Sequence, residues 1–211
     1  MIPALLSRLT PVARTVAWPA LLAGTLACVA IIAAASLAPD WSPLARWPGL
    51  GALALCAGAA FLLDDAASAT VSATPRTLAR RRLQLIALAL PLLFTAWTAC
   101  LWYATSTQGA WFGPDTRLAL SVQFAAMLTL TLAASAIALR LMSDEHAGWS
   151  GALAPLAILA AAIMLPERWA LLTLPSDTDW TAAQHRWYAL LSIGALGLAW
   201  ASRDPANRRH C

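Results

Sequence analysis

The chain has 211 residues, of which 60% are hydrophobic and only 11% are charged. Water-soluble domains carry about 25% charged residues, so this composition excludes an ordinary soluble domain and indicates a single membrane domain with little mass outside the bilayer. The net charge of +4 comes entirely from arginine, because the sequence contains no lysine. We interpret the arginines as markers of cytoplasmic loops and expect no nucleic-acid partner.

The first 16 residues are predicted to form an amphipathic segment on the inner membrane surface, because they combine Leu5, Leu6 and Leu9 with Arg8 and Arg14. A cleaved secretory signal is the alternative. The apolar run that follows is longer than the 7–15 residues or so of a signal-peptide core, which favours an uncleaved first helix.

Six apolar runs are candidates for transmembrane helices, which need about 20 residues with a range of about 17–25. They are, in chain order, Ala17–Leu37, Pro48–Leu63, Leu83–Ala104, Leu118–Leu139, Trp149–Leu165 and Trp187–Ala201. The sequence therefore predicts an all-α polytopic membrane protein with six spans. The second, fifth and sixth runs are near the lower limit of length, so re-entrant paths and a count of five spans stay open.

The arginines predict the orientation of this six-span bundle. With the N-terminus inside, the inner segments hold ten arginines and the outer loops hold four. Since basic residues favour the cytoplasmic side, we expect both termini to be cytoplasmic and the protein to lie in the cell membrane. Residues 166–186 are then an outer loop.

The tryptophans are predicted to form belts at the two membrane interfaces, where an amphipathic ring is favoured. Trp169 and Trp187 fall near outer boundaries and Trp149 falls near an inner one. Trp97 is the only tryptophan placed well inside a predicted span.

The sequence contains no recognisable catalytic machinery. No Asp, Glu, Arg or His lies in the middle of a predicted span, where proton- and ion-coupled carriers usually keep such residues. No nucleotide-binding or hydrolase motif occurs. Cys28, Cys56, Cys100 and Cys211 do not have the spacing of a disulfide framework or a zinc site, and we interpret the first three as small buried residues. We expect no enzyme activity, no cofactor and no metal.

Uncharged polar side chains occur within several spans. The simplest interpretation is bonding to their own helix or packing between helices. The amide of Gln123 needs hydrogen-bonding partners and should face protein or a cavity. Gln123, Thr95 and Thr98 are our candidates for a substrate path.

The polar insert between the second and third spans, residues 64–82, is the most distinctive part of the sequence. Asp64 and Asp65 are placed to favour the positive N-terminal end of a short helix over Ala66–Thr74, and Pro75 ends that helix. Arg76, Arg80, Arg81 and Arg82 lead into the third span. A solvated cytoplasmic loop is the alternative interpretation.

This insert resembles the coupling segment of ABC-2 type transporter membrane subunits. The likeness rests on acidic residues at the end of the second span, the short Thr/Ala-rich helix, the Ala73-Thr74-Pro75 sequence and the basic stretch that follows. An Asp pair stands where the family usually has Glu, and Ala69-Thr70 is the nearest match to its common Gly-Thr. The six-span plan and the segment before the last span, which contains Trp169, Leu171, Leu172 and Trp180, also match in layout.

The resemblance implies a permease subunit that docks on a separate ATP-binding subunit and pairs with a second permease copy or a relative. The docking residues would be Asp64, Asp65, Thr70, Thr74, Pro75, Arg76, Arg80, Arg81 and Arg82. The uncharged spans favour a hydrophobic or amphipathic substrate, and the resemblance implies an exporter. The alternative is a membrane anchor or assembly protein that transports nothing.

Overall fold

The computed structural model describes residues 17–37, 47–63, 78–108, 113–141, 147–166, 169–173 and 177–202. All regular structure within these ranges is helical and they contain no strand, which confirms the predicted all-α class. The predicted amphipathic segment 1–16 lies outside the described residues.

A helix occupies each of the six apolar runs. The α-helices are α2 (Trp18–Leu37), α3 (Trp47–Ala60), α5 (Leu78–Gln108), α6 (Pro114–Leu141), α7 (Ala147–Met164) and α8 (Trp180–Ala201), and the 3-10 helix η2 (Phe61–Leu63) continues α3. Every helix except α2 begins before its apolar run, and the difference is largest for α5 and α8. Helix α5 already contains Arg80–Arg82, and α8 includes the last seven residues that the sequence assigns to the outer loop 166–186.

Proline and charge explain several helix positions. Pro114 is the first residue of α6, where its missing N–H costs nothing, and Asp115 and Arg140 lie in the first and last turns. Both charges therefore complement the helix dipole. Pro91 and Pro155 lie inside α5 and α7. Such prolines are tolerated in membrane helices because neighbouring groups satisfy the freed carbonyls.

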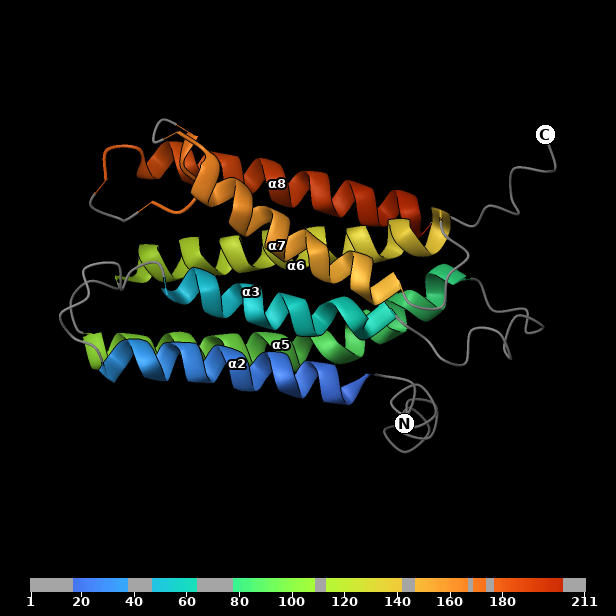
Figure 1. Ribbon diagram of the computed structural model, residues 1–211, viewed down its shortest axis with the longest axis horizontal. Coiled ribbons are helices and arrows are strands. Elements are labelled where there is room, and N and C mark those ends of the chain that lie inside the picture. Colours follow the sequence, from blue (N-terminus) through green and yellow to red (C-terminus); the bar gives the residue numbers. More distant parts are fainter. Residues whose placement is uncertain are drawn as a thin grey trace.

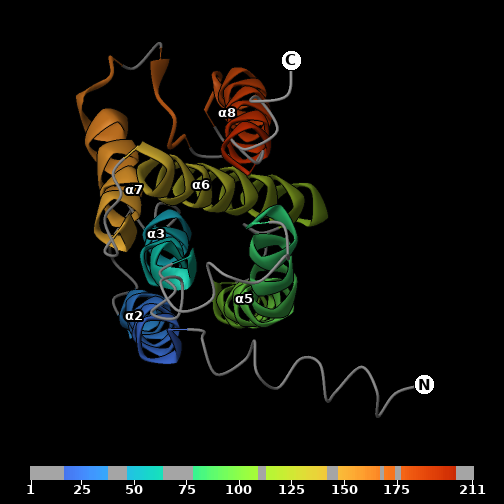
Figure 2. The same ribbon diagram turned by 90° about the vertical axis from the view of Figure 1, so that its right-hand side faces the viewer.

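Consecutive helices run in opposite directions along one bundle axis (Figure 1). We name the two ends of the bundle after arginines. At the Arg140 end, α2 and α5 begin and α6 and α8 finish; at the Arg186 end, α2 and α5 finish and α6 and α8 begin. Viewed end-on, α6 lies between α8 and α3, while α2 and α5 form the opposite side (Figure 2). The most extensive helix contacts are those of α6 with α8 and of α2 with α3.

Glycines allow the closest helix contacts. A Cβ built on Gly24 of α2 would lie 2.7 Å from the Ala54 carbonyl oxygen, and one on Gly58 of α3 would lie 2.6 Å from the Ala20 carbonyl oxygen. The backbones of α2 and α3 therefore touch. Small residues serve this purpose in membrane bundles, where burial of apolar surface does not itself bring helices together.

Three helices are long and apolar enough to cross a membrane, judged by length and composition: Trp18–Ala35, Leu83–Ser106 and Pro114–Leu141. Pro48–Leu63 and Trp149–Ala161 are shorter apolar helices. Helix α8 carries Gln184, His185 and Arg186 within its first turns, which lowers its hydropathy. A full crossing by α3, α7 and α8 stays a prediction.

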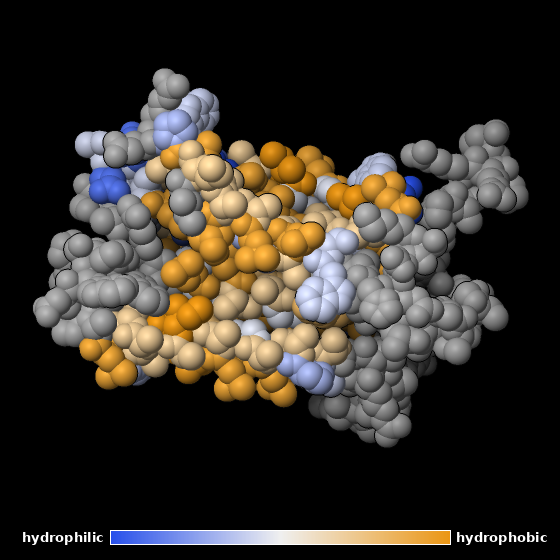
Figure 3. All heavy atoms as spheres, viewed as in Figure 1, coloured by the Kyte–Doolittle hydropathy of each residue, from blue (hydrophilic) through white to orange (hydrophobic). Residues whose placement is uncertain are grey.

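The outer surface supports a membrane setting. On the face in Figure 3, hydrophobic residues cover the middle of the bundle and strongly hydrophilic ones lie near its ends. Large apolar side chains face outward on all three long helices, among them Leu26 (68% exposed), Trp102 (71%) and Leu118 (63%). A water-soluble protein rarely exposes so continuous an apolar surface.

Candidate functional site

The predicted docking residues lie mainly beyond the described part of the chain. Asp64, Asp65, Thr70, Thr74, Pro75 and Arg76 are outside the described residues. Arg80, Arg81 and Arg82 are placed in the first turns of α5, in one continuous helix with the third apolar run. Residues 64–77 connect the end of η2 to the start of α5. Both of these helix ends lie at the Arg140 end of the bundle (Figure 1).

The predicted path residues do not come together within one chain. Gln123 on α6 is 3% exposed and lies inside the bundle. Thr95 and Thr98 lie on the exposed side of α5. Their hydroxyls donate hydrogen bonds of 2.9 Å to the carbonyls of Leu92 and Phe94 in their own helix, the back-bonding that neutralises a hydroxyl in lipid.

Aromatic rings connect α5 to α6. The rings of Trp97 and Phe124 stack with centroids 5.0 Å apart, and Phe94 meets Phe124 edge-on at 5.4 Å. Trp97 and Phe124 are almost completely buried, and the Trp97 Nε1 has no hydrogen-bond partner among the described residues. A buried N–H without a partner costs about 1–3 kcal/mol. Trp97 stacks on Phe124, the residue after Gln123, and the sequence did not single it out as a site residue. The Gln184 side-chain amide on α8 is also buried without a hydrogen-bond partner among the described residues.

At the Arg186 end, the start of α8 contacts residues that precede it in the chain. The Trp187 Nε1 donates a hydrogen bond of 2.9 Å to the Leu171 carbonyl, and an Arg186 guanidinium nitrogen donates one of 2.8 Å to the Ala170 carbonyl. Leu171 itself is buried in the core. Residues 169–173 therefore pack back onto the bundle.

Trp187 is not part of the outer tryptophan belt in which the sequence analysis placed it. Its side chain is fully buried in the protein, and the 169–173 segment covers it through the hydrogen bond from its indole. An aromatic belt requires a ring that faces the headgroup region. Trp169, by contrast, is 54% exposed and has the Arg186 guanidinium over its ring.

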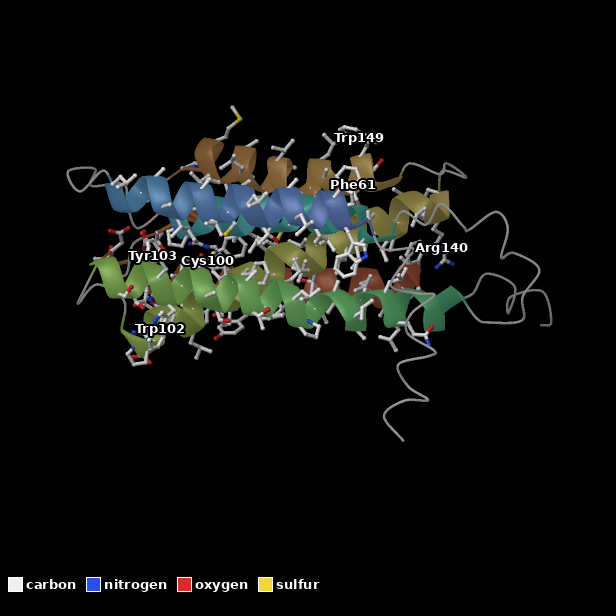
Figure 4. All side chains as sticks on the ribbon, turned by 90° about the horizontal axis from the view of Figure 1, so that it is seen from below. Phe61, Cys100, Trp102, Tyr103, Arg140 and Trp149 are labelled. Atoms are coloured by element: carbon white, nitrogen blue, oxygen red, sulfur yellow. The ribbon has the colours of Figure 1, made fainter. Side chains whose placement is uncertain are left out.

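At the Arg140 end, two contacts tie the helix ends together. A guanidinium nitrogen of Arg140 donates a hydrogen bond of 2.6 Å to the Trp200 carbonyl, and the guanidinium carbon lies 4.3 Å from the centroid of the Trp200 ring. Phe61 and Trp149 meet edge-on with centroids 5.6 Å apart. Figure 4 shows Arg140 and the Phe61–Trp149 pair at the same end of the bundle. At this end, one contact therefore joins α6 to α8 and the other joins η2 to α7.

Residues that could hold a metal do not gather in the part of the chain that the structure describes, where no group of three His, Cys, Asp or Glu side chains has a suitable arrangement. Cys28, Cys56 and Cys100 are buried there as free thiols. No protein-family model, no curated protein and no solved structure matches the chain.

Proposed function

We propose that the chain is the membrane-spanning permease subunit of an ATP-binding cassette transporter of the ABC-2 type, driven by a separate ATP-binding subunit. In this proposal all six helices cross the cell membrane, and both chain termini are cytoplasmic. A second copy or a related chain completes the transport path. The alternative is a membrane anchor or assembly protein without transport activity.

The observation that carries the proposal is the position of Arg80–Arg82. They lie in the same continuous helix as the third apolar run, at the Arg140 end of the bundle. A force that a partner applies at Arg80–Arg82 would act on α5 itself, which runs as one helix from Leu78 to Gln108 with Pro91 inside it. Such direct transmission is what an ATP-driven change between two arrangements of helices requires.

The charge of this end favours the cytoplasmic side. Arg80–Arg82 at the start of α5 and Arg140 at the end of α6 share it, and basic residues accumulate in cytoplasmic segments. An ATP-binding partner is cytoplasmic, so the predicted docking segment and its partner would meet on the same side.

The uncharged interior of the bundle favours transport driven by ATP hydrolysis in a partner subunit over ion-coupled transport. Among the described residues, the buried polar side chains are Gln123, Thr131 and Ser135, and none of them is charged. Ion-coupled carriers use buried ionisable residues as binding sites and relays. An uncharged interior also favours a hydrophobic or amphipathic substrate, and we propose export as its direction.

Co-purification tests the proposal. The native chain is expressed with candidate ATP-binding subunits, and beside it a variant with Asp64, Asp65 and Arg80–Arg82 changed to alanine. The matched control is Arg208→Ala with Arg209→Ala, which removes charge from the predicted cytoplasmic C-terminus. We expect the native chain and the control to retain the ATPase and the first variant to lose most of it.

The outcomes separate the two functions. Retention of an ATPase that depends on residues 64–82, with ATP hydrolysis that rises on assembly, supports the permease. A native chain that retains no ATPase in any combination contradicts it and leaves the anchor. Equal loss in both variants contradicts a specific docking role for residues 64–82.

A further inference from the structure

Two buried cysteines from different helices lie in direct contact. The Sγ atom of Cys28 on α2 is 3.6 Å from the Sγ atom of Cys100 on α5, although the residues are 72 positions apart. Both are free thiols inside the hydrophobic core. In Figure 4, Cys100 lies on the side of α5 that is turned toward α2. The Cys28 thiol donates a hydrogen bond to the Cys100 sulfur, which holds the two groups together.

Helix α3 holds Cys28 in this position. A Cβ built on Gly51 of α3 would lie 3.1 Å from the Cys28 sulfur, so the α3 backbone closes the space behind the thiol. The Cys28 sulfur thus lies between the α3 backbone at Gly51 and the sulfur of Cys100. Cys56 of α3 is buried in the same core, yet among the described cysteines only Cys28 and Cys100 have sulfur atoms in contact.

We propose that Cys28 and Cys100 are an oxidisable thiol pair that a lipid-soluble quinone converts to a disulfide between α2 and α5. Both S–H bonds break and one S–S bond forms. The two electrons and two protons pass to the quinone, which leaves as the hydroquinone. An S–S bond measures about 2.05 Å, so the sulfur atoms need to approach each other by about 1.5 Å from their present separation.

The surroundings select the class of oxidant. Cys28 lies in the apolar helix Trp18–Ala35 and Cys100 in the apolar helix Leu83–Ser106. Cys28 is inaccessible and Cys100 is 6% exposed, so an oxidant must reach the pair from the hydrocarbon region and through the Cys100 side. A quinone dissolves in that region, whereas a charged oxidant does not.

The bond would join two helices that differ in how extensively they pack on the rest of the bundle. Helix α2 is packed tightly on α3, while α5 makes its most extensive backbone contact with α2 and few with the rest of the bundle. A disulfide at Cys100 therefore fixes α5 to the α2–α3 pair. If the chain is the proposed permease, this bond restrains the helix that starts with Arg80–Arg82, and transport stops. That consequence rests on the proposed function, but formation of the bond does not.

Thiol counting in lipid tests the pair. Cys211→Ser is used as the parent, because it removes the terminal cysteine and leaves the three buried thiols. The protein in nanodiscs is treated with a short-chain ubiquinone analogue or with ferricyanide, then denatured and labelled with a maleimide polymer. Cys56→Ser in the parent is the matched control, and Cys28→Ser and Cys100→Ser are the test variants.

We expect the quinone to remove two of the three thiols of the parent and both remaining thiols of the Cys56→Ser control. The Cys28→Ser and Cys100→Ser variants should keep both of theirs, dithiothreitol should restore the losses, and ferricyanide should have little effect. Peptide mapping of the oxidised parent identifies the bond without relying on any test variant. Full retention of thiols in the parent, or a mapped bond that includes Cys56, overturns the proposal.

The same samples separate this inference from the permease. A Cys28–Cys100 bond in a protein that neither binds an ATPase nor transports supports the thiol pair and contradicts the permease. ATP-driven transport that the quinone leaves unchanged, with no bond formed, supports the permease and contradicts the thiol pair.

Discussion

The Ser135 hydroxyl on α6 donates a hydrogen bond of 2.9 Å to the carbonyl of Ala60, the last residue of α3. The same hydroxyl also lies 3.2 Å from the carbonyl oxygen of Thr131 in its own helix, so its contact with Ala60 is the part that joins two helices. In a membrane interior, water does not supply a replacement partner. Gly151 of α7 lies against the same Ser135 side chain. One hydroxyl thus marks the place where α3, α6 and α7 meet.

Removal of this hydroxyl should destabilise the three-helix contact. We expect Ser135→Ala to lower the free energy of unfolding by roughly 0.5–1.5 kcal/mol, the range of interhelical hydrogen bonds in membranes. Denaturation with sodium dodecyl sulfate in mixed micelles measures it. Ser192→Ala is the control, because the Ser192 hydroxyl is exposed and bonds only to Tyr188 in its own helix. Equal stability of the two variants would contradict a role for the Ala60 carbonyl contact.

The crossing of α2 and α3 should tolerate no side chain at its two glycines. Gly24→Ala places a methyl group 2.7 Å from the Ala54 carbonyl oxygen, and such overpacking costs about 1–3 kcal/mol. Gly197→Ala serves as the control, since its nearest neighbour in other helices is the Ala133 methyl at 3.4 Å. We expect a lower thermal midpoint in detergent for Gly24→Ala alone. A comparable loss in Gly197→Ala would indicate a general intolerance of substitution in these helices.

The positions of the helices follow from the apolar runs, because only a helix satisfies its own backbone in lipid. Their inward faces do not follow, since α2 and α3 are apolar on every side and such a helix carries no periodic signal. The sequence did predict that the Gln123 amide faces protein, which its burial confirms. It did not show that Thr95 and Thr98 lie on the exposed side of α5, or that the buried Cys28 and Cys100 are in contact. The start of α8 at Trp180 was missed because Gln184, His185 and Arg186 interrupt the apolar pattern.

The indole hydrogen bond of Trp187 should hold residues 169–173 on the bundle. Trp187→Phe keeps most of the buried ring but removes the donor to the Leu171 carbonyl, which leaves that buried acceptor unpaired and costs about 1–3 kcal/mol. We expect faster hydrogen exchange of the amides of residues 170–173, measured by mass spectrometry. Trp102→Phe is the control, because Trp102 is exposed on α5 and points away from the bundle (Figure 4). Unchanged exchange in Trp187→Phe would show that apolar burial of Leu171 is sufficient.

Orientation in the membrane can be tested with single thiols at the two ends of the bundle. In the native chain, Cys28, Cys56 and Cys100 are buried, so a membrane-impermeant maleimide should modify Cys211 alone, and only after the cytoplasmic side is opened. In the Cys211→Ser chain, Ser106→Cys near the end of α5 should react in intact cells. Ser202→Cys, directly after α8 at the opposite end of the bundle, should react only in opened cells. Labelling of Ser202→Cys in intact cells would reverse the orientation and place Arg80–Arg82 outside. Reaction of both variants from the same side would contradict a crossing of the membrane between these two ends.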